Sequence, residues 1–219
     1  MDSTTSRRAP AGPGSEQPAQ DGFDSVSFPE EQLLLVDEQD RVLGYGSKQR
    51  LHAGEGLLHR AFSVFLFDAQ NRLLLHRRSD LKPLWPGFWT NSCCSHPRRG
   101  ERLESAVTRR LREELGVAAT ALQEIYSFEY RARYADVGSE YEMCHVFLAR
   151  LRGGEQPRVH PAEISSCCWL RPDEVDAWMT ARRAELTPWF QLEWQALRAG
   201  HRAQLQGYLD GALGPRSAA

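Results

Sequence analysis

Alternating stretches of hydrophobic and polar residues predict strands in the first half of this chain. The apolar runs come in two pairs, each split by a short polar segment: 33–36 with 41–45, and 61–67 with 72–76. Short apolar runs separated by about four polar residues are typical of antiparallel hairpins. The pattern therefore predicts two hairpins before the middle of the chain.

A helical period replaces this pattern in the middle of the chain. Apolar residues recur at every fourth position and are followed by Gly116; they are Leu103, Val107, Leu111 and Leu115. Residues four apart share one face of a helix, and glycine commonly ends one. We expect a helix over residues 102–115 that packs its apolar face on a sheet.

The second half combines further strands with helices. Strands are predicted over 124–134, 140–151 and 164–170, followed by a helix from Pro172 and one last helix with an apolar face. That face carries Phe190, Trp194, Leu197, His201, Leu205 and Tyr208. Helices that flank a mixed sheet predict an α+β domain with α/β/α layers.

The two ends of the chain differ in composition from the part between them. Residues 1–25 are rich in Pro, Gly, Ser, Gln and Ala with few large apolar side chains, so they bury too little surface to offset their ordering entropy. We expect a disordered tail there, a single domain over 26–213, and a second tail over 214–219. At 219 residues the chain has room for one substantial core.

Charge and cysteine content limit the function classes. The formal net charge of −2 gives no overall attraction to nucleic acid or anionic membranes. The chain has no run of about 18 apolar residues and no secretory signal pattern. Five cysteines, two pairs of them adjacent, make a poor disulfide framework and favour a reducing compartment. We expect a cytoplasmic protein, although Arg7 and Arg8 leave an organellar leader open.

Candidate chemistry is concentrated in the segment Asn-Ser-Cys-Cys-Ser-His at 91–96. Side chains alternate along an extended segment, so Cys93 and Cys94 point in opposite directions and only one of them faces a pocket. Glu140 and Glu142 share one face of a predicted strand, as two carboxylates that approach one ion would. Taken alone, a cysteine here is as easily a small buried hydrophobe, and such a glutamate pair a solvated edge.

The predicted middle helix carries a motif. The run Arg-Arg-Leu-Arg-Glu-Glu-Leu-Gly-Val at 109–117 resembles the core of the Nudix box, and Glu101 stands where the box has an earlier glutamate. Two positions depart from it: Ser95 replaces a glycine and Arg110 a glutamate. Nudix hydrolases use the helix glutamates to bind metals that assist diphosphate cleavage. The resemblance therefore implies a Nudix-like fold with an impaired hydrolase site.

Four further segments resemble type I isopentenyl-diphosphate isomerases, which share the Nudix fold; they are 56–67, 85–97, 140–142 and 187–190. The resemblance extends from about Leu33 to Tyr208. It implies conversion of isopentenyl diphosphate to dimethylallyl diphosphate, in isoprenoid biosynthesis, by proton addition and removal through a tertiary carbocation. Cys94 and Glu142 would be the proton-transfer groups on opposite faces of the substrate. Tyr130 would lie beside Glu142, and the indole of Trp189 would face the cation.

The resemblance also implies a metal site and a diphosphate site. One divalent metal would be held by His52, His59, His96, Glu140 and Glu142. Five nitrogen and oxygen ligands suit an octahedral-like shell, which favours Mn²⁺ or Mg²⁺, although Zn²⁺ stays possible. A second ion, Mg²⁺ bound to the diphosphate, would contact Glu114. The basic residues of the diphosphate site would be Lys48, Arg78, Lys82 and Arg110.

Two alternatives to an isomerase stay open. A Nudix diphosphohydrolase would have no stated use for Cys94 or for three histidines, and Arg110 would weaken its metal site. A metal-stabilised binding protein without catalysis would use the histidines and glutamates for folding alone. The expected ligand is a small isoprenoid diphosphate, without nucleic acid or membrane, and the sequence does not indicate an oligomeric state.

Overall fold

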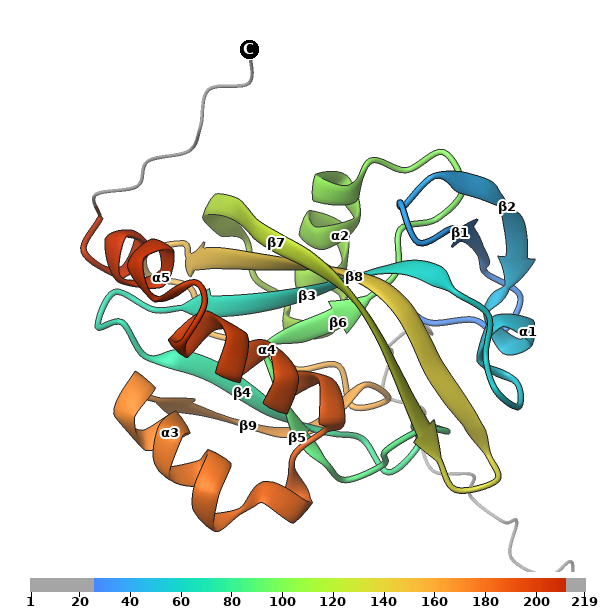
Figure 1. The fold of residues 1–219 in the computed structure, drawn as a ribbon. Helices are drawn as coiled ribbons and strands as arrows, with labels where there is room; N and C mark the ends of the chain where they lie inside the picture. Colours follow the sequence, from blue (N-terminus) through green and yellow to red (C-terminus); the bar gives the residue numbers. More distant parts are fainter. Residues whose placement is uncertain (1–25, 212–219) are drawn as a thin grey trace, which may run out of the picture.

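A computed structural model describes residues 26–211, which form one mixed sheet with helices on both of its faces (Figure 1). The expected tails at 1–25 and 214–219 lie outside the described residues. In chain order the nine strands are β1 (Gln32–Val36), β2 (Val42–Ser47), β3 (His59–Phe67), β4 (Leu73–Arg78), β5 (Trp89–Thr90), β6 (Cys93–Ser95), β7 (Ala119–Tyr134), β8 (Gly138–Leu151) and β9 (Ile164–Leu170). The helices are α1 (Lys48–His52), α2 (Leu103–Leu115), α3 (Pro172–Ala181), α4 (Pro188–Arg198) and α5 (Arg202–Leu209), with a 3₁₀ turn at Arg183–Glu185.

Strand β3 lies at the centre of the sheet. It runs parallel to β8 along its whole length, from His59 opposite Glu142 to Phe67 opposite Arg150. It also pairs with β6, where Ser63 lies opposite Cys94. Strands β7 and β8 form a long antiparallel hairpin that extends past the rest of the sheet (Figure 1). Strands β6 and β8 are thereby brought close to the same part of β3.

The alternation of side chains along β3 divides the core into two halves. Phe62, Val64 and Leu66 face α2, whose apolar residues cover that side of the sheet. Phe65 and Phe67 face the opposite side, where α3, α4 and α5 contribute side chains such as Phe190 and Trp194. Burial of large apolar side chains on both faces stabilises three layers. The α/β/α prediction is confirmed.

Most predicted elements exist, and two predictions need correction. The expected last helix is in fact two helices, because the chain leaves α4 after Arg198 and restarts at Arg202, with Gly200 at the break. The hairpin of β3 and β4 has its tight turn, but the strands pair only at Phe67 and Leu73 and then diverge. Strand β4 pairs instead with β5 and β9.

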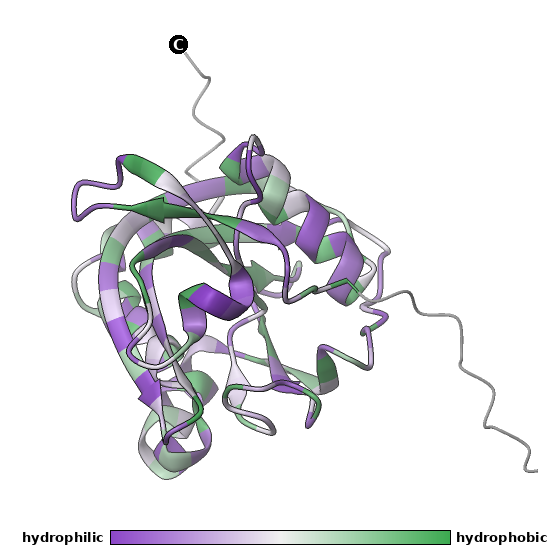
Figure 2. Cartoon of the chain, turned by 90° about the vertical axis from the view of Figure 1, so that its right-hand side faces the viewer, coloured by the Kyte–Doolittle hydropathy of each residue, from purple (hydrophilic) through white to green (hydrophobic). Residues whose placement is uncertain are grey.

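Helix α1 was not predicted, because five residues are too few to show a helical period. Ser47 caps it: its side chain accepts a hydrogen bond from the Arg50 backbone N–H. Figure 2 looks onto the end of the molecule that carries this short, mainly hydrophilic helix. Only Leu51 is buried there, and the helix ends at His52. His52, a residue of the candidate site, is therefore the last residue of a helix whose start is stabilised by the Ser47 cap.

Candidate metal centre and active-site pocket

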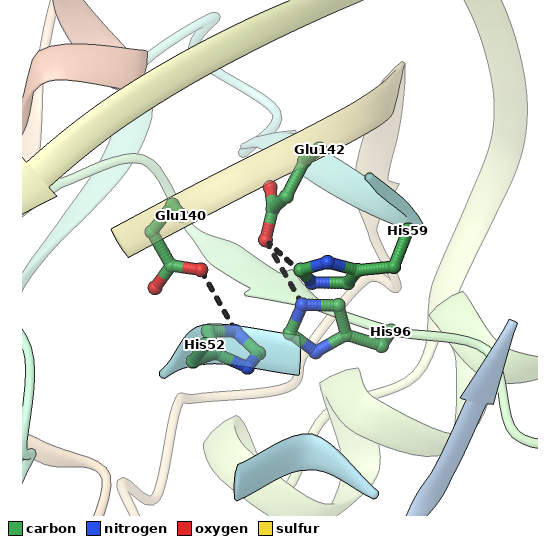
Figure 3. A group of neighbouring side chains, drawn as sticks. All are labelled: His52, His59, His96, Glu140 and Glu142. Carbon is green, nitrogen blue, oxygen red and sulfur yellow. Dashed lines mark hydrogen bonds and ion pairs between the residues drawn. The ribbon is translucent and has the colours of Figure 1, made fainter. Parts of the chain in front are cut away.

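Three histidines and two glutamates from separate parts of the chain meet at one end of the sheet (Figure 3). Each offers one ligand atom, and all five atoms lie within 4.8 Å of one another. Strand β8 supplies the two glutamates, and the histidines come from the end of α1, the start of β3 and the residue after β6. The cluster is His52, His59, His96, Glu140 and Glu142, hereafter the His/Glu cluster.

Short polar contacts connect the members of the His/Glu cluster. His52 Nε2 lies 2.9 Å from a Glu140 oxygen, and His96 Nε2 lies 2.9 Å from Glu142 Oε1. His59 Nε2 lies 3.8 Å from the same Glu142 oxygen and has no hydrogen-bond partner among the described residues. The alternation of β8 explains why both glutamates point into the cluster. Each carboxylate therefore faces at least one imidazole.

Backbone carbonyls orient two of the imidazole rings. His52 Nδ1 lies 2.7 Å from the carbonyl oxygen of Lys48, and His59 Nδ1 lies 2.7 Å from that of Leu57. A ring whose Nδ1–H donates to a carbonyl keeps the lone pair on Nε2, which is the arrangement usual for metal-binding histidines. Both Nε2 atoms face the glutamates. His52 and His59 thus present their Nε2 atoms to the carboxylates.

Burial determines the protonation of the cluster. It lowers the pKa of His59 to about 3 and that of His96 well below its usual value. Burial and the nearby charge of Glu140 raise the pKa of Glu142, whereas His52 holds the pKa of Glu140 below its ordinary value against the effect of burial. Two buried carboxylates disfavour each other's charge. A divalent cation between them would favour the charged form of both.

The residues present fit a divalent metal ion. Neutral imidazoles and carboxylates are ordinary ligands of such ions, and the buried Nε2 of His59 has no other partner among residues 26–211. Without a bound cation, this nitrogen and the two carboxylates would be buried with too few polar partners. The His/Glu cluster is therefore a candidate metal centre, and its donor set does not by itself select one metal.

A cavity of about 610 Å³ adjoins the His/Glu cluster. This volume is in the usual range for small-molecule sites. Its wall includes Cys94, Tyr130, Glu142 and Trp189, whereas Cys93 is fully buried on the α2 side. The alternation expected for the two cysteines is thus present. All four residues proposed for catalysis line the same cavity.

Hydrogen bonds fix the side chains on this wall. Tyr130 Oη donates to Glu142 Oε2 at 2.7 Å, and Cys94 Sγ donates to Asn91 Oδ1 at 2.8 Å. Trp189 Nε1 donates to Thr90 Oγ1 at 3.0 Å. Burial raises the pKa of the Cys94 thiol and, together with the charge of Glu142, that of the Tyr130 phenol. Both groups therefore stay protonated at neutral pH.

Three basic side chains line the cavity. Lys48, Arg78 and Lys82 all belong to its wall. Burial and the charge of Lys82 lower the pKa of Lys48 to about 8. Lys82 Nζ lies 2.6 Å from Glu163, another wall residue, and Arg78 lies 5.3 Å from the centre of the Trp189 ring. Closely spaced cations of this kind suit a diphosphate, which neutralises their repulsion.

Arg110 and Glu114 lie behind this wall. Both are buried on α2, and their side chains form a salt bridge of 2.6 Å. Arg110 also approaches Glu163 at 3.5 Å and donates to the backbone oxygen of Val26. Neither side chain belongs to the residues that line the cavity. Their connection to the cavity runs through Glu163, which links Arg110 to Lys82.

The Nudix-box residues of α2 are engaged in ion pairs with arginine. Arg109 contacts Glu101 at 2.7 Å and Glu113 at 3.0 Å. Arg110, at the position of a box glutamate, contacts Glu113 and Glu114. An arginine among carboxylates neutralises the charge that would otherwise attract metal ions. The helix is therefore held by salt bridges in place of a cluster of free carboxylates.

Sequence reasoning missed two residues that shape the site. Glu163 follows no motif, and only the fold brings it to Lys82 and Arg110. Gly138 begins β8 so close to the backbone of His52 that a Cβ there would overlap the His52 carbonyl oxygen. Glycine in a strand often marks such a close approach of two backbones. The glycine is visible in the sequence, but the sequence does not indicate which segment lies against it.

Comparison with known proteins agrees with this fold. Residues 57–190, more than half of the chain, match the NUDIX domain. The crystal structure of DR0079 from Deinococcus radiodurans aligns with a TM-score of 0.54 at 27% identity, covering 69% of this chain and 90% of that one. A MutT protein from Methanosarcina mazei aligns with a TM-score of 0.53 at 14% identity, covering 66% and 95%, which bears on the fold alone. The class is thus a NUDIX-domain protein.

Curated protein sequences show which family within this class the chain resembles. The chain is 45% identical over 156 residues to the isopentenyl-diphosphate Delta-isomerase of Nocardia farcinica, covering 71% of this chain and 87% of that protein. It is 38% identical over 172 residues to isopentenyl-diphosphate Delta-isomerase 1 of Photorhabdus laumondii, covering 78% and 97%. This chain belongs to the isopentenyl-diphosphate Delta-isomerase family.

Metal binding should depend on His59. We expect the purified protein to bind a divalent ion, and His59→Gln to weaken that affinity on the order of tenfold or more, because a buried nitrogen donor is lost. Isothermal titration with Mn²⁺, Zn²⁺ and Mg²⁺ measures this. His201→Gln, outside the cluster, is the matched control. If His59→Gln binds all three ions as tightly as the unchanged protein, the ligand set is wrong.

Gly138→Ala should weaken metal binding without removing a ligand. The added methyl group must push the backbone of His52 away, and His52 is a proposed ligand. Gly153→Ala, where a Cβ would have no neighbour within 4 Å, is the control. Metal titration of both variants, with circular dichroism to verify folding, tests this. Unchanged affinity in a folded Gly138→Ala protein would show that the position of His52 does not matter.

Proposed function

We propose that this protein interconverts isopentenyl diphosphate and dimethylallyl diphosphate. The observation that carries the proposal is the pairing of a thiol and a carboxyl in one cavity. Cys94 on β6 and Glu142 on β8 lie on strands that flank β3, and Glu142 also belongs to the His/Glu cluster. Two proton-transfer groups that approach a ligand from different strands are what a shift of a double bond requires.

The reaction needs one proton added and one removed. Protonation of the terminal methylene of the alkene gives a tertiary carbocation, and loss of a proton from the methylene on the diphosphate side forms the new double bond. Cys94 and Glu142 transfer these two protons. Burial keeps the Cys94 thiol protonated, and Tyr130 holds Glu142 in place by its hydrogen bond. The largely buried wall excludes water, which would otherwise capture the cation.

The indole of Trp189 stabilises the positive charge of the intermediate. The side chain is almost fully buried and anchored by Thr90. A cation near the face of a desolvated tryptophan gains about 0.5–2 kcal/mol or more. The guanidinium of Arg78 already lies beside this ring. Arg78 is held there by hydrogen bonds that it donates to the backbone oxygens of Leu84 and Trp85.

Positive charge on the cavity wall holds the diphosphate. Lys48, Arg78 and Lys82 contact its oxygens, and Arg110 acts from behind through Glu163. The His/Glu cluster holds one divalent metal, for which Mn²⁺ or Mg²⁺ suits the five ligands, and Zn²⁺ is an alternative. Such an ion, when bound, fixes the Glu142 carboxyl and tunes its acidity. Mg²⁺ bound to the diphosphate is the expected second ion. Its candidate protein ligand is Glu114, which lies behind the cavity wall and would have to exchange its salt bridge with Arg110 for the ion.

A Nudix diphosphohydrolase is the second candidate and has less support. Glu113 and Glu114 on α2 already form ion pairs with Arg109 or Arg110. A hydrolase would need these carboxylates for metal ions at the scissile diphosphate. It would also give no role to Cys94, whose thiol lines the cavity. A binding protein without catalysis would leave Cys94, Tyr130 and Trp189 equally unexplained.

The cellular setting of this activity is also a proposal. The described cysteines are all free thiols, which supports a reducing compartment such as the cytoplasm. Within residues 26–211, helices long and apolar enough to cross a membrane are absent. The partner is a small isoprenoid diphosphate. Nucleic acid is not expected as a ligand, since the chain carries a net charge of −2.

The direct test is incubation of the purified protein with isopentenyl diphosphate and Mg²⁺. We expect the acid-labile allylic product to accumulate without release of phosphate. A parallel incubation with nucleoside diphosphate derivatives tests the hydrolase alternative. Phosphate release there, with no allylic product in the first assay, would contradict the proposal.

The two adjacent cysteines should differ in their importance. Cys94→Ala removes a proposed proton-transfer group, so we expect activity to fall below detection while the protein stays folded. Cys93→Ala shortens a buried side chain on the α2 face and should cost about 1 kcal/mol of stability with most activity kept. Turnover assays with urea unfolding measure both effects. Equal loss of activity in two folded variants would mean that the wrong thiol is assigned.

Trp189 should act on kcat more than on binding. Trp189→Phe keeps a weaker aromatic face, whereas Trp189→Leu keeps only apolar volume, and both lose the hydrogen bond to Thr90. We expect kcat of the Leu variant to be about tenfold below that of the Phe variant. Affinity for a saturated, unreactive diphosphate should be similar in both. If the two variants share the same kcat, the indole serves only to exclude water.

A further inference from the structure

A buried chain of hydrogen bonds joins the Trp189 indole to the Cys94 thiol. Trp189 Nε1 and Thr187 Oγ1 both donate to Thr90 Oγ1, at 3.0 and 2.9 Å. Thr90 Oγ1 donates to Asn91 Oδ1 at 2.8 Å, and the same oxygen accepts from Cys94 Sγ at 2.8 Å. Thr90 and Asn91 are fully buried, and neither belongs to the residues that line the cavity. The proposed chemistry alone gives these two residues no role.

The backbone fixes the orientation of the Asn91 amide. Its Nδ2 donates to the backbone oxygens of Val64 and Cys93, both at 3.2 Å. A carbonyl oxygen accepts and cannot donate, so the nitrogen of the amide must face these two atoms. The opposite orientation would turn the amide oxygen toward two other oxygens. Asn91 Oδ1 therefore faces the thiol of Cys94 and the hydroxyl of Thr90.

The remaining hydrogens of the chain follow from the chemistry of its members. An indole N–H can only donate, and an amide oxygen can only accept. The one hydroxyl hydrogen of Thr90 therefore goes to Asn91, and its two lone pairs receive Trp189 and Thr187. Every donor and acceptor of this hydroxyl is used. Fully satisfied buried networks favour one arrangement of their side chains.

This arrangement connects separate parts of the cavity wall. Thr90 ends β5, Cys94 lies in β6, and Trp189 lies in the first turn of α4. Both Cys94 and Trp189 line the cavity, so the hydrogen bonds between them fix the sulfur relative to the indole. In the proposed reaction one of these groups transfers a proton and the other faces the resulting cation. A misplacement of about 1 Å in such a site can lower the rate about a hundredfold.

We propose that Thr90 and Asn91 are positioning residues that hold the Cys94 thiol and the Trp189 indole in register with each other. The kinetic consequence of this role rests on the proposed function. Asn91 fixes the sulfur through its amide oxygen, and Thr90 ties that oxygen to the indole. Neither residue touches the ligand or transfers a proton to it.

Two substitutions at residue 90 separate hydrogen bonding from packing. Thr90→Val keeps the shape of the side chain and removes the hydroxyl, so kcat should fall about tenfold, the order of one lost orienting hydrogen bond, with KM nearly unchanged. Thr90→Ser keeps the hydroxyl, and most of kcat should be retained. Steady-state assays with isopentenyl diphosphate measure both. Equal kcat in the two variants, or a loss confined to KM, would overturn the proposal.

Thr187→Val is the matched comparison for general destabilisation. Thr187 is as fully buried as Thr90, and its hydroxyl donates to Thr90 without lying on the path from the indole to the thiol. We expect this variant to unfold at lower urea concentration than the unchanged protein and to keep kcat within about twofold. A loss of kcat as large as that of Thr90→Val would attribute the effect to destabilisation and would overturn the proposal.

A second measurement needs no activity. The indole N–H signal of Trp189, assigned in the ¹⁵N-labelled full chain through Trp189→Phe, reports the hydrogen bond to Thr90. Cys94→Ala removes one of the two donors to Asn91 Oδ1, which should strengthen the bond from Thr90 and shift the indole signal. The same Cys94 substitution should cause no shift when Thr90 is already valine. Cys93→Ala, whose side chain points to the α2 side, is the control and should leave the signal in place.

The outcomes of this measurement separate the two claims. An indole signal that does not respond to Cys94→Ala, or that responds equally with valine at residue 90, would overturn the positioning role whatever the activities. Failure of the proposed function looks different, because the unchanged protein would form no allylic product. The indole signal would then still show whether Thr90 and Asn91 connect the two groups.

Discussion

Two carboxylates in one buried site are the constraint on which the rest of this structure depends. Glu140 and Glu142 lie on the same face of β8 and are almost fully buried. Burial of two like charges so close together is unfavourable unless positive charge compensates them. The three imidazoles supply ordered nitrogen donors around the carboxylates, and burial keeps His59 and His96 neutral, which suits metal binding. The ends of α1, β3 and β6 must therefore all converge on β8.

This convergence also sets the shape of the cavity. The parallel pairing of β3 with β8 places His59 opposite Glu142, and the pairing of β3 with β6 places Cys94 opposite Ser63. The metal ligands and the proposed acid are thus fixed by the same backbone hydrogen bonds. Helix α4 contributes Trp189 to the cavity wall, and the basic residues Lys48, Arg78 and Lys82 belong to the same wall.

The sequence could predict the structural features that depend on residues close together along the chain. The period of α2 and the stop at Gly116 follow from local chemistry, and so does the opposite direction of Cys93 and Cys94. The gathering of the His/Glu cluster was predicted through the family resemblance, since its members span residues 52 to 142. Alternation alone could say only that Glu140 and Glu142 share a face.

Other features depend on tertiary contacts that no local pattern reveals. The parallel pairing of β3 and β8 joins distant segments, and the break at Gly200 divides a continuous apolar period into two helices. Glu163 acquires its role only when the fold brings it to Lys82 and Arg110.

In the proposed reaction one group adds a proton from solvent-exchangeable hydrogen while another removes a different proton. Isomerisation in D₂O, followed by NMR of the product, tests it directly. We expect deuterium in the newly formed methyl group of dimethylallyl diphosphate, because the acid that protonates the alkene exchanges with solvent. Product that forms at the full rate with no deuterium in that methyl group would contradict it.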